Sequence, residues 1–136
     1  MTRARYLLDT EICIYLRKRR PAGLVEKFKT LSPGEAAISV ITYGELWLGA
    51  HRHRDQTVSR NVEEFTTLVP PLPMPSAAGA TYGRILSVLQ QQGQVIGVND
   101  LWIAAHAVTS GLVLVTNNLR EFRRVPELQV ADWVTE

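Results

Sequence analysis

Three acidic side chains stand where a chain of alternating strands and helices would place its chemistry. Asp9 ends a short apolar run, and Glu45 and Asp100 each lie near the start of a predicted helix. Junctions that follow parallel strands meet at the carboxyl edge of a sheet, where ligands bind. Carboxylates gathered at such an edge repel one another unless a cation neutralises them. The pattern therefore indicates a metal-dependent enzyme, provided that the fold brings the three acids together.

Each of these acids also has a purely structural interpretation. Asp9 or Thr10 could cap the helix that follows, because both side chains accept hydrogen bonds from free helix N–H groups. Thr42 and Glu45 have the spacing of a capping box, with Thr42 at the cap and Glu45 at the third helical position. One shared cation explains the acids more economically than separate caps.

Asp100 has the same ambiguity. Asn99 is a good capping residue, and this would leave Asp100 in the first helical turn, where the helix dipole stabilises a negative charge. Both interpretations put Asp100 at the same end of the helix.

A fourth polar group follows the strand predicted at 112–115. Thr116, Asn117 and Asn118 stand there, and Glu121 comes three residues later. The two asparagines suit a loop, since asparagine tolerates left-handed backbone. They could equally bind a metal, a metal-bound water or a phosphate, and Glu121 could add a carboxylate.

The candidate ligands are all oxygen atoms, which favours Mg²⁺ or Mn²⁺ over Zn²⁺. His51 and His53 point in different directions on a helix, and no cysteine pair accompanies them or His106. The single cysteine, Cys13, lies between isoleucines and is expected to be a buried apolar side chain. No glycine-rich phosphate loop, serine elbow or dinucleotide fingerprint is present.

The composition is that of a globular protein. The 136 residues fit a single domain, 1–136, and 46% of them are apolar. No apolar run is long enough for a membrane span, and the apolar run after the basic N-terminus is too short for a signal peptide. These features predict a cytoplasmic protein.

The net charge of +2 says little, but the cations are clustered. The clusters are Arg17–Arg20, His51–Arg54 and Arg120 with Arg123 and Arg124. Each could contact a phosphate backbone. The first two could also be solvated ends of helices, where cations are favourable.

Hydrophobic periodicity predicts alternating elements along the chain. Strands are expected at 4–8, 36–40, 112–115 and 128–130. Helices are expected at 11–20, 24–31, 43–53, 57–68, 76–91 and 99–109. The proline-rich stretch 69–75 is interpreted as a rigid connection. Strands separated by helices imply a three-layer α/β/α sandwich around a mostly parallel sheet of about five strands.

These residues resemble a known family in four stretches, which occur in the family's order and span nearly the whole chain. The stretches are Tyr6–Leu16, Ile38–Leu46, Ile96–Ala107 and Leu114–Pro126. On these residues the chain resembles the PIN-domain ribonucleases, and within them the VapC toxins of type II toxin–antitoxin systems.

The resemblance implies a PIN-like fold, RNA cleavage, a homodimer and a cognate VapB-like antitoxin. It also implies that Asp9, Glu45 and Asp100 are the acidic site residues. Two positions depart from the family pattern. Glu11 stands where the family usually has Asn or Ser, and Asn118 stands where many members carry a fourth acid, which Glu121 could replace.

The function expected from these residues is that of a toxin that cleaves RNA phosphodiesters by a metal-activated water. Asp9 and Asp100 would ligate Mg²⁺ (or Mn²⁺), and Glu45 would ligate it or orient water. Asn118 would hold water or a second ion. Contacts to the substrate are expected from Thr10, Thr116 and Asn117.

Three alternatives stay open at this point. The sequence Asp9-Thr10-Glu11 loosely resembles the paired acids of haloacid-dehalogenase-type phosphatases, although no Lys follows residue 29. A response-regulator switch also uses acids at a sheet edge, but it would require a Lys after a late strand, where this sequence has Thr116, Asn117 and Asn118. A catalytically weak PIN-fold binding protein is the third, and Trp47 could then dock a partner's helix or simply pack in the core.

Overall fold

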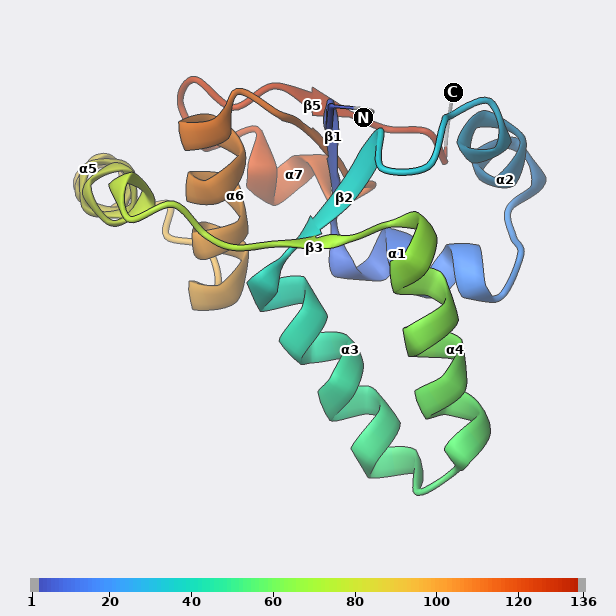
Figure 1. Ribbon diagram of the computed structural model, residues 1–136. Coiled ribbons are helices and arrows are strands. Elements are labelled where there is room, and N and C mark those ends of the chain that lie inside the picture. The colour runs from blue at the N-terminus through green and yellow to red at the C-terminus, as the bar shows by residue number, and fades with distance from the viewer. Residues whose placement is uncertain (1–2, 135–136) are drawn as a thin grey trace.

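The computed structural model describes residues 3–134 and contains a five-stranded sheet with helices on both faces (Figure 1). The strands are β1 (Tyr6–Leu8), β2 (Ala36–Ser39), β3 (Pro71–Leu72), β4 (Val113–Val115) and β5 (Val130–Ala131). The helices are α1 (Thr10–Arg17), α2 (Ala22–Lys29), α3 (Val40–His53), α4 (Gln56–Leu68), α5 (Ala77–Gln91), α6 (Val98–Ser110) and α7 (Leu119–Phe122). The predicted α/β sandwich is confirmed.

The sheet is parallel throughout the described residues, with the strand order β3-β2-β1-β4-β5. β1 lies at its centre and pairs with both β2 and β4. Because all strands run the same way, their carboxyl ends lie along one edge. The segments that leave β1, β2 and β4 therefore start close together.

Two hydrophobic cores cover the two faces of the sheet. Side chains of a strand alternate between faces. Leu8 and Val115 accordingly pack into the core under α1 to α4, whereas Leu7 and Leu114 pack into the core under α5, α6 and α7. All four side chains are fully buried. This alternation fixes the register of the central strands and thus the place where each strand ends.

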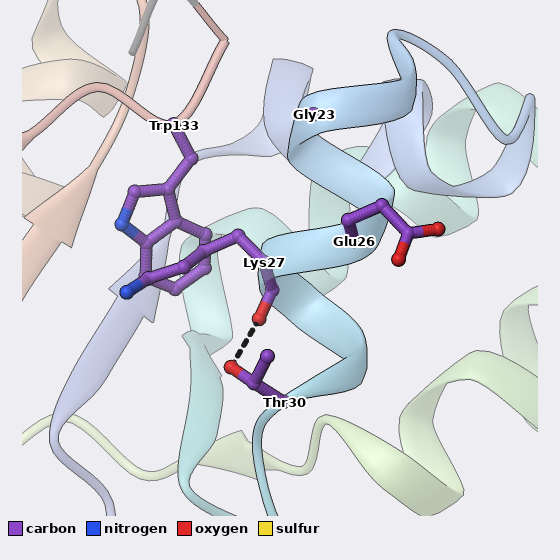
Figure 2. A pocket seen from close by; sticks show the side chains of 5 residues that line it. All are labelled: Gly23, Glu26, Lys27, Thr30 and Trp133. Carbon is purple, nitrogen blue, oxygen red and sulfur yellow. Dashed lines mark hydrogen bonds between the residues drawn. The ribbon is translucent and has the colours of Figure 1, made fainter.

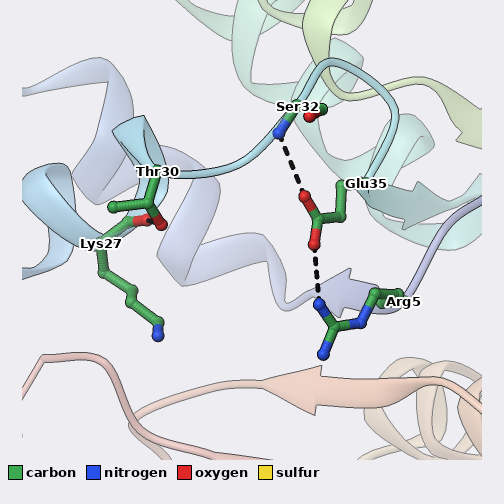
Figure 3. Close-up of polar contacts among 5 residues, drawn as sticks. All are labelled: Arg5, Lys27, Thr30, Ser32 and Glu35. Atoms are coloured by element: carbon green, nitrogen blue, oxygen red, sulfur yellow. Dashed lines mark hydrogen bonds and ion pairs between the residues drawn. The ribbon is translucent and has the colours of Figure 1, made fainter. Parts of the chain in front are cut away.

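The amino edge of the sheet is held by contacts that lie away from the acids. Arg5 makes an ion pair of 2.9 Å with Glu35, which also accepts a hydrogen bond from the Ser32 N–H (Figure 3). Trp133 packs edge-on against Tyr6 with ring centroids 5.0 Å apart. Lys27 lies 5.9 Å over the indole, in a shallow hollow beside α2 (Figure 2).

The capping residue of α3 differs from the sequence prediction. Ser39 caps this helix by accepting a hydrogen bond from the Ile41 N–H at 3.2 Å. The helix already begins at Val40, so Thr42 and Glu45 lie within it and form no capping box. The prediction was wrong because the β-branched Val40 and Ile41 were assigned to the strand and its exit.

The cap of α6 was also predicted incorrectly. The helix begins at Val98 after Gly97, and no side chain caps it. Asn99 is therefore a helical residue, and its side chain is free for another contact. Asp100 does lie in the first turn, as expected.

Two short elements escaped the sequence prediction. The proline-rich connection contains the edge strand β3, and the loop expected after β4 contains α7. Cys13 is buried, as predicted. Trp47 is half-buried and packs against the core, with its ring edge-on to Tyr43. No helix between residues 3 and 134 has the length and apolarity that crossing a membrane requires.

Candidate active site

The predicted acids come from three elements that meet at the carboxyl edge of the sheet. Asp9 follows β1, Glu45 lies in α3 and Asp100 in α6. The backbone places Asp9 beside the end of β4, because its N–H donates to the Val115 carbonyl at 2.9 Å. Thr116 follows directly and lies on the same edge. The sheet order thus joins residues that are more than 100 positions apart in the sequence.

Asp9 caps α1, as one of its two predicted roles requires, and it also makes a contact across the sheet edge. One carboxylate oxygen, Oδ1, accepts a hydrogen bond from the Thr10 N–H at 2.8 Å and so caps α1. The other, Oδ2, accepts a hydrogen bond from the Thr116 hydroxyl at 2.9 Å. Burial raises the pKa of Asp9, these two hydrogen bonds oppose that shift, and the charges of Glu11 and Glu45 add to it. The carboxylate is therefore fixed in position yet costly to ionise without a counter-charge.

Glu45 accepts one short hydrogen bond from α1 and one long hydrogen bond from α6. The Thr10 hydroxyl donates to Glu45 Oε1 at 2.6 Å, and it lies 3.1 Å from the Thr42 hydroxyl. Asn99 of α6 donates to Glu45 Oε2 at 3.5 Å. Glu45 is thus oriented from both sides toward the edge where Asp9 lies.

The charges of the other acids act on Asp100. Partial burial raises its pKa to about 6, and the charges of Asp9, Glu121 and Glu45 add to the shift, as does a hydrogen bond with Glu121. Four acids from different parts of the chain therefore share one electrostatic environment. A positive charge at this place would lower the pKa of Asp100 and stabilise its ionised form.

The turn after β4 supplies the remaining polar groups. Asn118 Nδ2 donates to Glu121 Oε2 at 2.5 Å, and the Asn118 N–H donates to the Thr116 hydroxyl at 3.0 Å. Asn117 lies half-buried in the same turn. The structure therefore brings Glu121 to the site, although the sequence pattern indicated it only as a possible substitute for the missing fourth acid.

Thr42 and Asn99 were predicted as helix caps, and their contacts at the site were missed. The available signal was spacing along a helix. Thr42 lies three residues before Glu45, so the two share a helix face. Asn99 directly precedes Asp100, but its contact with Glu45 depends on how α3 and α6 pack.

The donor chemistry fits a hard divalent cation, because every candidate ligand is a carboxylate or amide oxygen. Within residues 3–134, however, no three His, Cys, Asp or Glu side chains are arranged closely enough to hold one ion together. Asp9, Glu45 and Asp100 are thus neighbours that feel one another's charge without forming a ready three-ligand group. Mg²⁺ keeps several waters and needs only one or two carboxylates, so two direct protein ligands suffice.

Comparisons with known proteins identify the family of the chain. The family model for the PIN domain matches residues 6–128. Ribonuclease VapC2 of Haemophilus influenzae is 41% identical over 133 residues, which cover 96% of this chain and 98% of that protein. The tRNA(fMet)-specific endonuclease VapC of Shigella flexneri is 40% identical over 132 residues, which cover 95% and 98%.

Solved structures give the same result. VapBC-1 from nontypeable Haemophilus influenzae has a TM-score of 0.88 at 41% identity, covering 96% of this chain and 98% of that one. VapBC2 from Rickettsia felis, bound to a DNA fragment from its promoter, has a TM-score of 0.87 at 32% identity, covering 94% and 98%.

Proposed function

This chain belongs to the PIN-domain family and, within it, to the VapC ribonucleases, and we propose that it is a metal-dependent endoribonuclease acting as the toxin of a type II toxin–antitoxin pair. The proposal is supported by the match of residues 6–128 to the PIN-domain family, and by the charges of Asp9, Glu45 and Glu121 that act on Asp100. A cluster of acids is unfavourable by itself and useful to a cation-assisted hydrolase.

The metal would be held by Asp9 and Asp100, and Glu45, which forms no three-acid group with them in the described part of the chain, would orient the attacking water. A bound Mg²⁺ or Mn²⁺ would lower the pKa of water and neutralise charge on the scissile phosphate. No side chain is needed as a nucleophile. Water adds to the phosphorus and the 3′-oxygen leaves with a proton, so the products carry a 5′-phosphate and a 3′-hydroxyl.

Thr10 and Thr116 were expected to contact the substrate, but a different role is better supported. Their hydroxyls are already engaged by Glu45 and Asp9. We therefore assign them to positioning these carboxylates, and we assign Asn118 to holding Glu121 at the site. Asn117 remains a candidate for contact with the RNA.

The proposed partners follow from the family. The similar structures from Haemophilus influenzae and Rickettsia felis are described as VapBC. We propose a VapB-like antitoxin as the partner of this chain, within a hetero-oligomer built on a toxin homodimer in the cytoplasm. The family match replaces the phosphatase and response-regulator alternatives. A catalytically weak binding protein remains as an outcome of the experiment below.

The test is cleavage of end-labelled RNA by the partner-free protein in Mg²⁺ or Mn²⁺. Asp9→Asn and Asp100→Asn should each lower the rate by about 100-fold or more, because each removes a metal-binding charge. EDTA should stop cleavage. The matched control is Asp55→Asn, an exposed acid that caps α4 and whose replacement can still cap it.

Two results would contradict the proposal in different ways. If either site variant cuts as fast as the unsubstituted protein, the assignment of the acids is wrong. If the unsubstituted protein cuts no RNA with either metal but still binds an antitoxin, the chain is a binding protein with a PIN fold.

A further inference from the structure

A basic hollow lies where α1 meets α3 and α4. Figure 1 shows the hairpin of α3 and α4 projecting from the sheet. Its volume is about 330 Å³. Arg17 and Lys18 line it from α1, Gly49 and His53 from α3, and Asn61 from α4. Among the described residues, no acidic side chain lines it. The charge of this surface is therefore opposite to that of the acidic site.

The acidic site and the hollow lie at opposite ends of one face of α1 and one face of α3. Glu45, Gly49 and His53 follow one another at four-residue intervals, so they lie along one face of α3. Thr10, Ile14 and Lys18 likewise follow one another at four-residue intervals, so they lie along one face of α1. Thr10 touches Glu45 at one end, and Lys18 and His53 line the hollow at the other. Eight helical residues separate the two ends by about 12 Å.

Arg17 has an incomplete set of partners. It is half-buried, and its Nε is shielded from solvent without a hydrogen-bond acceptor anywhere in the described part of the chain. Buried polar groups normally have such an acceptor, so an unmatched one requires an explanation. Glu64 lines an adjoining hollow together with Arg17 and Arg19, yet it forms no ion pair with Arg17 in the described structure.

The hollow has room for a ligand because position 49 carries no side chain. A Cβ atom built on Gly49 would meet no other atom within 4 Å. An anionic oxygen could therefore approach α3 closely while accepting hydrogen bonds from the guanidinium of Arg17. A phosphate suits this donor set, because guanidinium groups form paired hydrogen bonds with its oxygens.

We propose that Arg17, Lys18 and the hollow they line form a binding subsite for a backbone phosphate of the RNA that lies about 12 Å from the scissile phosphate. This inference rests on the proposed ribonuclease function. The strand would run along the faces of α1 and α3 that carry Thr10 and Glu45, with its scissile phosphate at the acids. The basic subsite would set the register of cleavage through the backbone alone.

An acidic segment of a protein partner is the main competing occupant. Ile14 is 36% exposed and Leu48 is 49% exposed, and exposed apolar side chains of this kind could pack against a bound peptide. The RNA is favoured because the hollow is basic, has no acidic side chain among its described lining residues, and lies along the helix faces that carry Thr10 and Glu45. Binding of a partner there, and of no RNA, is one outcome of the experiment.

The experiment measures RNA affinity by fluorescence anisotropy in an Asp100→Asn background, so that binding is read without cleavage. Arg17→Gln should weaken binding by about tenfold, the value of one charged hydrogen bond. It should also reduce the slope of log K against log salt by about 0.7, for one phosphate contact on a single strand. Lys18→Glu should also weaken RNA binding, and it should leave the stability of the fold unchanged because Lys18 is exposed. Lys29→Gln is the control that removes the same charge, since Lys29 lies at the end of α2 and does not line the hollow.

A second arm locates the contact. A series of RNAs carries one neutral methylphosphonate linkage each, at successive positions from the cleavage site. The one linkage whose phosphate reaches the hollow, about 12 Å from the acids, should weaken binding in the background protein and have no further effect with Arg17→Gln. In the cleaving protein, Arg17→Gln should raise KM for long RNA and leave kcat unchanged.

The outcomes separate the two proposals. Unchanged RNA affinity in both Arg17→Gln and Lys18→Glu, with cleavage by the unsubstituted protein intact, overturns this inference alone and leaves the hollow to a protein partner. The subsite is equally overturned if every neutral linkage adds to the effect of Arg17→Gln by the same amount. Failure of the unsubstituted protein to bind or cut RNA overturns the ribonuclease proposal together with this one.

Discussion

The Thr10 hydroxyl donates a hydrogen bond of 2.6 Å to Glu45, and this contact joins the first residue of α1 to a carboxylate in the middle of α3. The same residue's N–H binds Asp9. Thr10 therefore orients two of the acids at once, one through its backbone and one through its side chain. A residue placed in this way acts on the chemistry through its neighbours.

Replacement of Thr10 tests that role. Thr10→Val keeps the shape and removes the donor, so Glu45 should lose its orientation beside Asp9. Cleavage should fall by about ten- to a hundredfold, as for other residues that orient metal ligands. Thr10→Ser keeps the hydroxyl and should stay near the original rate. Equal rates for the valine and serine variants would show that the contact is incidental.

The stability of the metal-free protein should depend on Asp100 and on pH. Burial and neighbouring charges raise the pKa of Asp100 from 3.8 to about 6. Between these values the folded protein retains a proton that the unfolded chain has released, so rising pH destabilises the fold. Asp100→Asn should thus match the original near pH 4 and exceed its stability above pH 6, by about 1–2 kcal/mol after allowance for solvent screening.

Urea unfolding in EDTA at a series of pH values measures this difference. Asp55→Asn, at an exposed acid, should show no such trend. A difference between Asp100→Asn and the original protein that stays constant across the pH range would refute the shared environment of the acids.

Glu121 should influence Asp100 through its charge. Its carboxylate raises the pKa of Asp100 both by repulsion and by a hydrogen bond. Glu121→Gln removes the charge, so the pKa of Asp100 should fall toward its ordinary value. The acid limb of the pH–rate profile should then move to lower pH. Glu64→Gln, at an exposed acid of α4, is the control, and an unmoved limb in Glu121→Gln would contradict the predicted coupling.

Ser39 should matter for stability through two contacts. It caps α3 and lies 3.1 Å from Nδ1 of the buried His106, which links the helix of Glu45 to the helix of Asp100. Ser39→Ala should lower the free energy of unfolding by about 1–2 kcal/mol. Ser87→Ala, at an exposed position in α5, should change it little. Thermal denaturation of both variants measures these changes. If Ser39→Ala were as stable as Ser87→Ala, neither contact of Ser39 would contribute to stability.

Much of the fold follows from sequence patterns because hydrophobic period and helix ends are local properties. The long helices and the strands β1, β2, β4 and β5 were predicted within a few residues. β3 was missed because two residues, Pro71 and Leu72, are too few to show a hydrophobic period. They form a strand only because they pair with β2. Likewise α7 is too short to show a helical pattern.

The site was predictable only in part. Asp9 and Asp100 could be named because one follows a strand and the other lies in the first turn of a helix, whereas Glu45 was named from a capping box that the structure does not contain. The contacts of the acids could not be predicted, because these depend on the strand order and on how helices pack. The engagement of Thr116 with Asp9 requires β4 to lie beside β1. The capping roles given to Thr42 and Asn99 were wrong because the helices began earlier than the β-branched residues suggested.

The most direct test of the central claim is a crystal of the partner-free protein soaked in Mn²⁺ and examined by anomalous diffraction. We predict one peak about 2.1 Å from carboxylate oxygens of both Asp9 and Asp100. Crystals of Asp100→Asn treated alike should lack it. A site that stays empty at saturating Mn²⁺, in protein that nevertheless cuts RNA, would contradict the account.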